Sequence, residues 1–120
     1  MENAPILTCL VLEPVAVVAD DLASMVRDEL PGARVLVAAT VEAAEEVLRG
    51  EKPDIAFVNL PPTEPALTDL VVRLEGMAVT VVLMEARPET SAAARRFIEM
   101  PFLRSAVAEE LRAVLRRMTG

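Results

Sequence analysis

Short aliphatic runs alternate with amphipathic segments along almost the whole of this chain. Runs rich in Val, Leu and Ile, without strict polar–apolar alternation, are typical of strands that are buried on both faces of a parallel sheet. The chain has three Phe and no Trp or Tyr, so its core must be aliphatic. We predict strands at 6–12, 34–39, 54–58, 78–84 and, more briefly, 97–99.

The segments between and after these runs have the spacing of helices. Val18, Leu22, Val26 and Leu30 recur four residues apart in the first of them, which predicts one apolar helix face. The last segment carries the clearest stripe, formed by Leu103, Val107, Leu111, Leu115 and Met118. Glycines follow the first three predicted helices, where a left-handed C-cap residue is favoured, and they are Gly32, Gly50 and Gly76.

Strict β–α alternation with short connections predicts right-handed crossovers. The expected fold is therefore α/β, a doubly wound five-stranded parallel sheet with helices on both faces, in three layers. The chain has 120 residues, which suits one domain spanning 1–120. The fourth crossover, at 85–96, is close to the minimum length for a parallel connection, so we expect its helix, the fourth, to be short.

Charge and composition exclude several classes of function. The net charge of −7 opposes a phosphate backbone, so we expect no nucleic acid partner. Glu13 and Pro14 interrupt the first apolar run far short of a membrane span, and no basic leader precedes it. Cys9 is the single cysteine and lies in an apolar run, which predicts an unreactive core thiol. We expect a cytoplasmic protein without a membrane contact.

Ligands of open parallel sheets bind outside the carboxyl ends of the strands, so function is sought in the residues that follow each strand. This edge has no glycine to bring backbone N–H groups to a phosphate, and the chain has no His to activate a nucleophile. Charged metal ligands are limited to Glu13 and Glu85. We therefore expect no enzyme. The residues at this edge are Glu13, Pro14, Thr40, Asn59, Pro61, Pro62, Glu85 and Met100.

The strand ends resemble those of response-regulator receiver domains, the CheY-like family of two-component signalling. The resemblance covers the whole chain and rests on LVLEP, PDIAFVNL and VVLMEA at three strand ends and on the triplet Met100-Pro101-Phe102 before the last helix. It implies a flavodoxin- or CheY-like sandwich. The short fourth crossover and the ending LRSAVAEELRAVLRRM look like a stand-alone receiver subgroup of alphaproteobacteria.

The resemblance also implies that the phosphorylation site is degenerate. Receivers place a pair of acids after the first strand to hold Mg²⁺, and here the pair is Glu13 and Pro14. Asn59 stands where the family has the phosphoryl-accepting aspartate, Glu85 where it has Thr or Ser, and Met100 where it has Lys. An amide is no phosphoryl acceptor and Met cannot pair with phosphate. We expect no catalytic residue and no Mg²⁺ cofactor, Glu13 being a weak metal candidate.

These observations predict a pseudo-receiver that works by protein–protein contact. The expected partner is a signalling protein such as a histidine kinase or an effector, or a second copy of the chain as a homodimer. The resemblance suggests a contact face formed by the short fourth helix, the fifth strand and the last helix. Half of the chain's 12 basic residues lie in its last 26 positions. Candidate interface residues are Arg95, Arg96, Phe102 and Arg104.

Other interpretations stay open from the sequence. Asn59 could simply hydrogen-bond the turn that follows its strand, and Glu13 and Glu85 could be solvent-facing loop acids or a close pair. An active receiver could accept the phosphoryl group on Glu64 or Asp69, the nearest acids in the sequence. A small-molecule sensor would need a pocket at the altered edge.

Overall fold

The computed structural model describes residues 6–61, 63–84, 96–97 and 104–119. The strands are parallel and lie in the order β2-β1-β3-β4-β5. The elements in chain order are β1 (Thr8–Leu12), α1 (Ala16–Glu29), β2 (Arg34–Ala38), α2 (Val41–Gly50), β3 (Ile55–Val58), α3 (Leu67–Gly76), β4 (Thr80–Leu83), β5 (Arg96–Phe97) and α4 (Arg104–Thr119).

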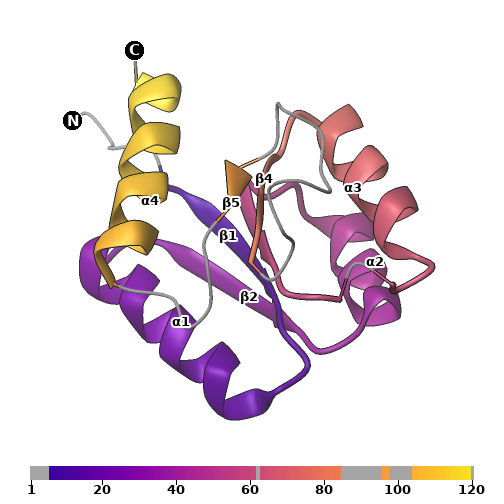
Figure 1. Cartoon of the computed structure of the whole chain (residues 1–120). Coiled ribbons are helices and arrows are strands. Elements are labelled where there is room, and N and C mark those ends of the chain that lie inside the picture. Colours follow the sequence, from indigo (N-terminus) through magenta and orange to yellow (C-terminus); the bar gives the residue numbers. More distant parts are fainter. Residues whose placement is uncertain (1–5, 62, 85–95, 98–103, 120) are drawn as a thin grey trace.

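The sheet is the middle of three layers, with α1 and α4 on one face and α2 and α3 on the other (Figure 1). Successive side chains of a strand point to opposite faces, so each buried strand serves two cores. In β1, Leu10 and Leu12 pack toward α2 and α3, while Cys9 and Val11 pack toward α1 and α4. Burial on both faces is the reason these runs are apolar without alternation.

The prediction of an α/β fold with a parallel sheet between helices is confirmed. The four longer strands lie inside the predicted runs, with ends that differ by up to two residues. β5 pairs with β4 over only two residues, Val82 with Arg96 and Leu83 with Phe97, so a fifth strand of the predicted extent is not confirmed. The short helix expected at 85–96 lies almost wholly outside the described residues.

The prediction of left-handed glycines after the helices is wrong. Gly32, Gly50 and Gly76 all have negative φ angles, and the left-handed residue in the described part of the chain is Ala78, with φ 64°. Gly50 and Gly76 are the last residues of α2 and α3. After α3 the chain turns two residues later than predicted, so the left-handed conformation falls on an alanine.

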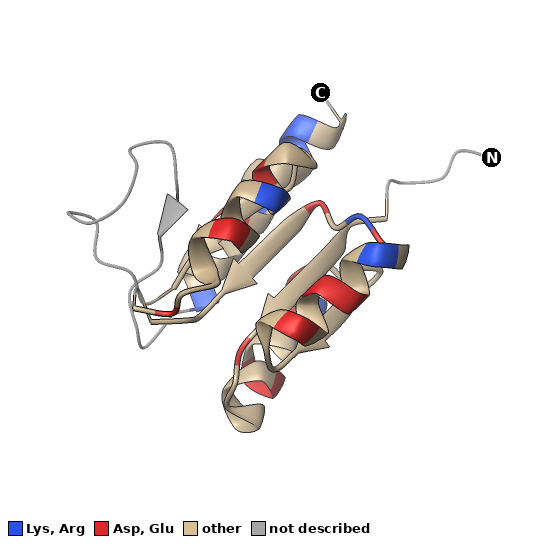
Figure 2. Cartoon of the chain, turned by 90° about the vertical axis from the view of Figure 1, so that its right-hand side faces the viewer, with Lys and Arg blue, Asp and Glu red and all other residues tan. Residues whose placement is uncertain are grey.

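Charged residues lie on the helices and connecting segments, and the strands between them are almost free of charge (Figure 2). Arg34, the first residue of β2, is the exception among the four longer strands. No helix in the described part of the chain is long and apolar enough to cross a membrane.

Candidate functional site

Two polar residues leave neighbouring strands at the same level of the carboxyl edge. Leu12 of β1 is the register partner of Val58 of β3, so Glu13 and Asn59 follow directly side by side. The backbone N–H of Asn59 donates to the carbonyl oxygen of Leu12 at 2.9 Å, and the N–H of Glu13 donates to Ala38 at 2.9 Å. These bonds extend the ladders beyond the strands and fix both backbones.

The side chains of Glu13 and Asn59 are joined by a hydrogen bond. The amide Nδ2 of Asn59 donates to Oε1 of Glu13, and the backbone N–H of Val15 donates to Oε2 at 2.9 Å. Only 3 % of Glu13 and 8 % of Asn59 is exposed. The interpretation of Glu13 as a solvent-facing loop acid is therefore wrong.

Two N–H donors and a helix terminus compensate the buried carboxylate. An ionised carboxylate is costly to bury unless it is hydrogen-bonded or paired. Val15 is the N-cap residue of α1 and has no side-chain cap bond, so Glu13 places its negative charge beside the N-terminus of α1. Because both oxygens of Glu13 already accept bonds, this arrangement holds the β1–α1 and β3–α3 connections together.

The remaining predicted positions are only partly described. Pro14 is exposed and follows Glu13 directly. Glu85 and Met100 lie outside the described residues, as do Arg95 and Phe102. Arg96 belongs to β5.

The structure also places the candidate metal ligands and the single thiol of the described residues. Within the described ranges, no three His, Cys, Asp or Glu side chains converge as metal ligands would. Cys9 is fully buried, and burial raises the pKa of its thiol far above the ordinary value. The expected position of Cys9 in the core is confirmed, and its low reactivity stays a prediction.

Three of the four arginines of α4 have partners within the chain. Arg104 pairs with Asp28 at 3.0 Å and Arg112 with Glu29 at 2.9 Å, both acids being at the end of α1. Arg117 donates to the hydroxyl of Thr80 at 2.7 Å. The Arg104 and Asp28 side chains are 56 % and 63 % exposed, so their pair contributes at most about 1 kcal/mol, and a partner could compete for Arg104.

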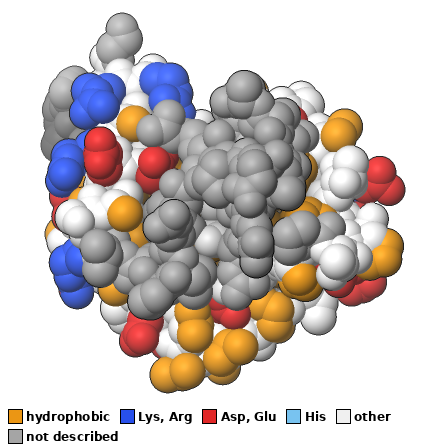
Figure 3. All heavy atoms as spheres, viewed as in Figure 1, with side chains coloured by type: hydrophobic (Ala, Val, Ile, Leu, Met, Phe, Trp, Pro, Cys, Tyr) orange, Lys and Arg blue, Asp and Glu red, His pale blue; other side chains and the backbone are white. Residues whose placement is uncertain are grey.

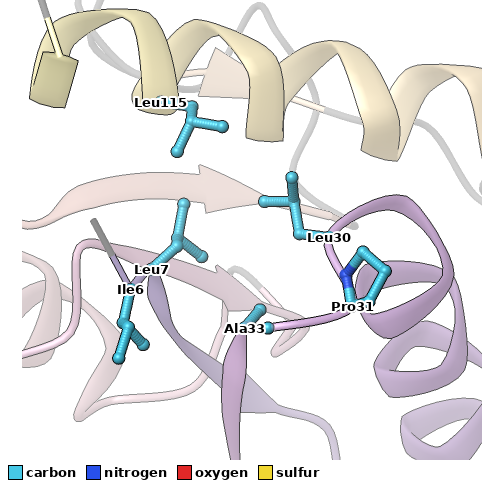
Figure 4. A pocket seen from close by; sticks show the side chains of 7 residues that line it. Ile6, Leu7, Leu30, Pro31, Ala33 and Leu115 are labelled. Atoms are coloured by element: carbon cyan, nitrogen blue, oxygen red, sulfur yellow. The ribbon is translucent and has the colours of Figure 1, made fainter. Parts of the chain in front are cut away.

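An apolar pocket of about 270 Å³ opens at the opposite, amino edge of the sheet (Figure 4). Its lining comes from the two residues before β1, the α1–β2 connection and α4. No polar side chain is among the lining residues, so the pocket lacks the groups that orient a small ligand. The residues that line the pocket are Ile6, Leu7, Leu30, Pro31, Gly32, Ala33 and Leu115.

Sequence reasoning placed Glu13 and Asn59 at one edge but missed their hydrogen bond. The signal that could have found it is an acid and an amide that each directly follow a strand, on strands that pair in parallel. An acceptor and a donor in equivalent places can meet when the strands are neighbours.

Solved structures of receiver domains share this fold over most of the chain. The signal receiver domain of a DNA-binding response regulator (merR) from Colwellia psychrerythraea has a TM-score of 0.79 at 16 % identity, covering 92 % of this chain and 98 % of that one. The PhyR response regulator receiver domain from Erythrobacter litoralis has a TM-score of 0.75 at 24 % identity, covering 92 % and 90 %.

A two-component response regulator from Clostridium difficile has a TM-score of 0.79 at 15 % identity, covering 95 % of this chain and 99 % of that one. No protein-family model matches the chain, and no curated protein matches it significantly in sequence. At these identities the likeness establishes the CheY-like receiver fold.

Proposed function

We propose that this chain is a receiver-like domain of two-component signalling that accepts no phosphoryl group and acts through protein contacts. The observation that carries the proposal is the position of Asn59, which directly follows β3 and has its amide bonded to the buried carboxylate of Glu13. By the resemblance to receivers, this is the place of the acceptor aspartate. An amide has no anionic oxygen to attack phosphorus.

The neighbours of Asn59 support the same reading. Pro14 supplies no second carboxylate beside Glu13, and both oxygens of Glu13 already accept hydrogen bonds. A divalent cation binds through several oxygen ligands and would have to displace the Asn59 amide here. By sequence, Glu85 and Met100 replace the groups with which receivers contact phosphate.

Intact-mass measurement after incubation with acetyl phosphate and Mg²⁺ tests the proposal. We expect no gain of about 80 Da, the increment of one phosphoryl group. Asn59→Asp alone should also stay unlabelled, because Pro14 still removes a metal ligand. The quadruple variant Pro14→Asp/Asn59→Asp/Glu85→Thr/Met100→Lys, which restores all four replaced groups, is the positive control and should gain the label.

Labelling of the unaltered chain would contradict the proposal. Peptide mapping would then locate the phosphoryl group, and a label on Glu64 or Asp69 would support an active receiver with a non-standard acceptor.

The basic side of α4 is the surface that we assign to a histidine kinase or effector partner. The Lys and Arg side chains in view lie on the side of the molecule where α4 and α1 lie, with Asp and Glu side chains among them (Figure 3). Arg116 has no ion pair among the described residues and is exposed. A positive patch on a protein of net charge −7 can orient an acidic partner.

Charge reversal tests this surface. Arg104→Glu/Arg116→Glu should weaken capture of the partner, with little change in melting temperature, because exposed charges contribute little to stability. Arg49→Glu is the matched control, since Arg49 is an exposed arginine of α2 in the opposite layer. Equal loss of binding in both variants would exclude α4 as the specific contact.

A further inference from the structure

β2 forms an uncovered edge of the sheet. It stands at one end of the strand order, and no strand in the described part of the chain lies beyond it. Val37 is 48 % exposed, whereas its register partner Val11 in β1 is fully buried. Apart from Arg34 the strand reads Val-Leu-Val-Ala, without the Lys, Pro or bulge that usually protects an edge.

The hydrogen bonds of β2 show which of its backbone groups face outward. The N–H of Arg34 donates to Leu7 at 2.8 Å, and the carbonyl of Ala38 accepts from Glu13 at 2.9 Å, so residues 34 and 38 point toward β1. Backbone groups of successive strand residues point to alternate sides. The N–H and C=O groups of Val35 and Val37 therefore point away from the sheet.

We propose that this edge pairs antiparallel with β2 of a second copy, about a two-fold axis through Leu36. In that register Val35 of each copy lies opposite Val37 of the other. Both residues present outward N–H and C=O groups, so each such pair exchanges two hydrogen bonds. Leu36 faces its own counterpart, and every cross-strand pair among residues 35–37 is apolar.

Charge and exposure agree with a second copy as the occupant. Pairing places Val37 of each copy beside Val35 of the other, which removes exposed apolar area from water. The Arg34 end of each strand lies toward the other copy's α2, whose first turn carries Glu42. The Arg34 side chain is 57 % exposed even while it pairs with Glu51, so it remains accessible to an acid of a second copy.

Disulfide trapping tests the register. Residues at a non-hydrogen-bonded antiparallel pair have Cα atoms about 4.5 Å apart, within the range that a disulfide spans. Leu36→Cys should therefore form a covalent dimer under mild oxidation. The native Cys9 is buried, so we expect it to form no disulfide between copies. Val72→Cys, at a 58 % exposed position of α3, is the control for random collision.

Sedimentation equilibrium tests the association itself. The mass of the unaltered chain should rise toward that of a dimer as the concentration approaches about 1 mM, since a five-residue strand makes a small, weak interface. Val37→Pro removes an outward N–H without touching the β1 ladder, and Val37→Lys adds charge at the edge. Both should be monomeric, and Val72→Lys should associate as the unaltered chain does.

Two results would overturn the proposal. One is a monomeric mass for the unaltered chain over the whole concentration range, which would show that the β2 edge does not pair with a second copy. The other is a rate of covalent dimer formation no higher for Leu36→Cys than for Val72→Cys. Neither result depends on phosphorylation, so the proposed function is tested separately.

Discussion

Replacing Asn59 by Asp turns the hydrogen bond at the carboxyl edge into a contact between two carboxyl groups. The amide of Asn59 now donates to Oε1 of Glu13, and both side chains are more than nine-tenths buried. Asn59→Asp keeps the shape but removes the donor and adds a negative charge. We expect a loss of stability whose size depends on pH.

Two estimates of the loss at pH 7 agree. Two unit charges about 4 Å apart repel by about 4 kcal/mol at an effective dielectric constant near 20. Alternatively, the new carboxyl group takes up a proton and restores a donor to Glu13. Protonation costs about 1.4 kcal/mol for each pH unit above its ordinary pKa near 3.9, again about 4 kcal/mol.

The pH dependence has a definite sign. Repulsion raises the pKa of the new carboxyl group in the folded state above its unfolded value, so the folded state binds more protons. Its free energy of unfolding therefore rises as the pH falls. The loss relative to the unaltered chain should shrink from about 4 kcal/mol at pH 7 to about 1.5 kcal/mol at pH 5.

Urea unfolding at pH 5 and pH 7 measures both quantities. The matched control is Glu13→Gln/Asn59→Asp, which exchanges the donor and the acceptor and should unfold close to the unaltered chain at both pH values. If Asn59→Asp loses less than about 1 kcal/mol at pH 7, or if the double variant does not recover, the hydrogen bond is not the stabilising contact that we describe.

Four further predictions concern the α3–β4 connection, Glu13 and Cys9. Ala78→Gly should stabilise the fold by about 0.5–1 kcal/mol in urea unfolding, because it relieves the strain of an alanine in the left-handed conformation. Gly76→Ala should stabilise the fold by a similar amount, because alanine lowers the conformational entropy of the unfolded chain. A loss of stability in either variant would contradict the backbone conformations described here. Millimolar Mg²⁺ should leave the melting temperature unchanged, and a rise of several degrees beyond that in NaCl would show a working metal site at Glu13. A thiol reagent should modify Cys9 only as the chain unfolds, since burial raises its pKa, and rapid labelling of the folded protein would refute that burial.

The arrangement of layers was predictable because it follows from local patterns. A run such as 54–58 is apolar on both faces, and only a parallel sheet covered by helices buries both faces of a strand. The place of the candidate site was predictable for a related reason, since the carboxyl ends of parallel strands meet at one edge. The short fourth helix expected at 85–96 stays a prediction, because it lies almost wholly outside the described residues.

What the sequence determined by itself was the set of side chains available at each edge, and what the tertiary structure decided was which of them meet. Glu13 and Asn59 are 46 positions apart, and their hydrogen bond depends on β1 lying beside β3 in one register. From the sequence, Arg104 was predicted to be an interface residue, and only the packing of α4 against α1 shows that it pairs with Asp28. Hydrophobic periodicity is local and survives in the sequence, whereas polar pairs need atoms within about 3 Å, a precision that only the packed chain supplies.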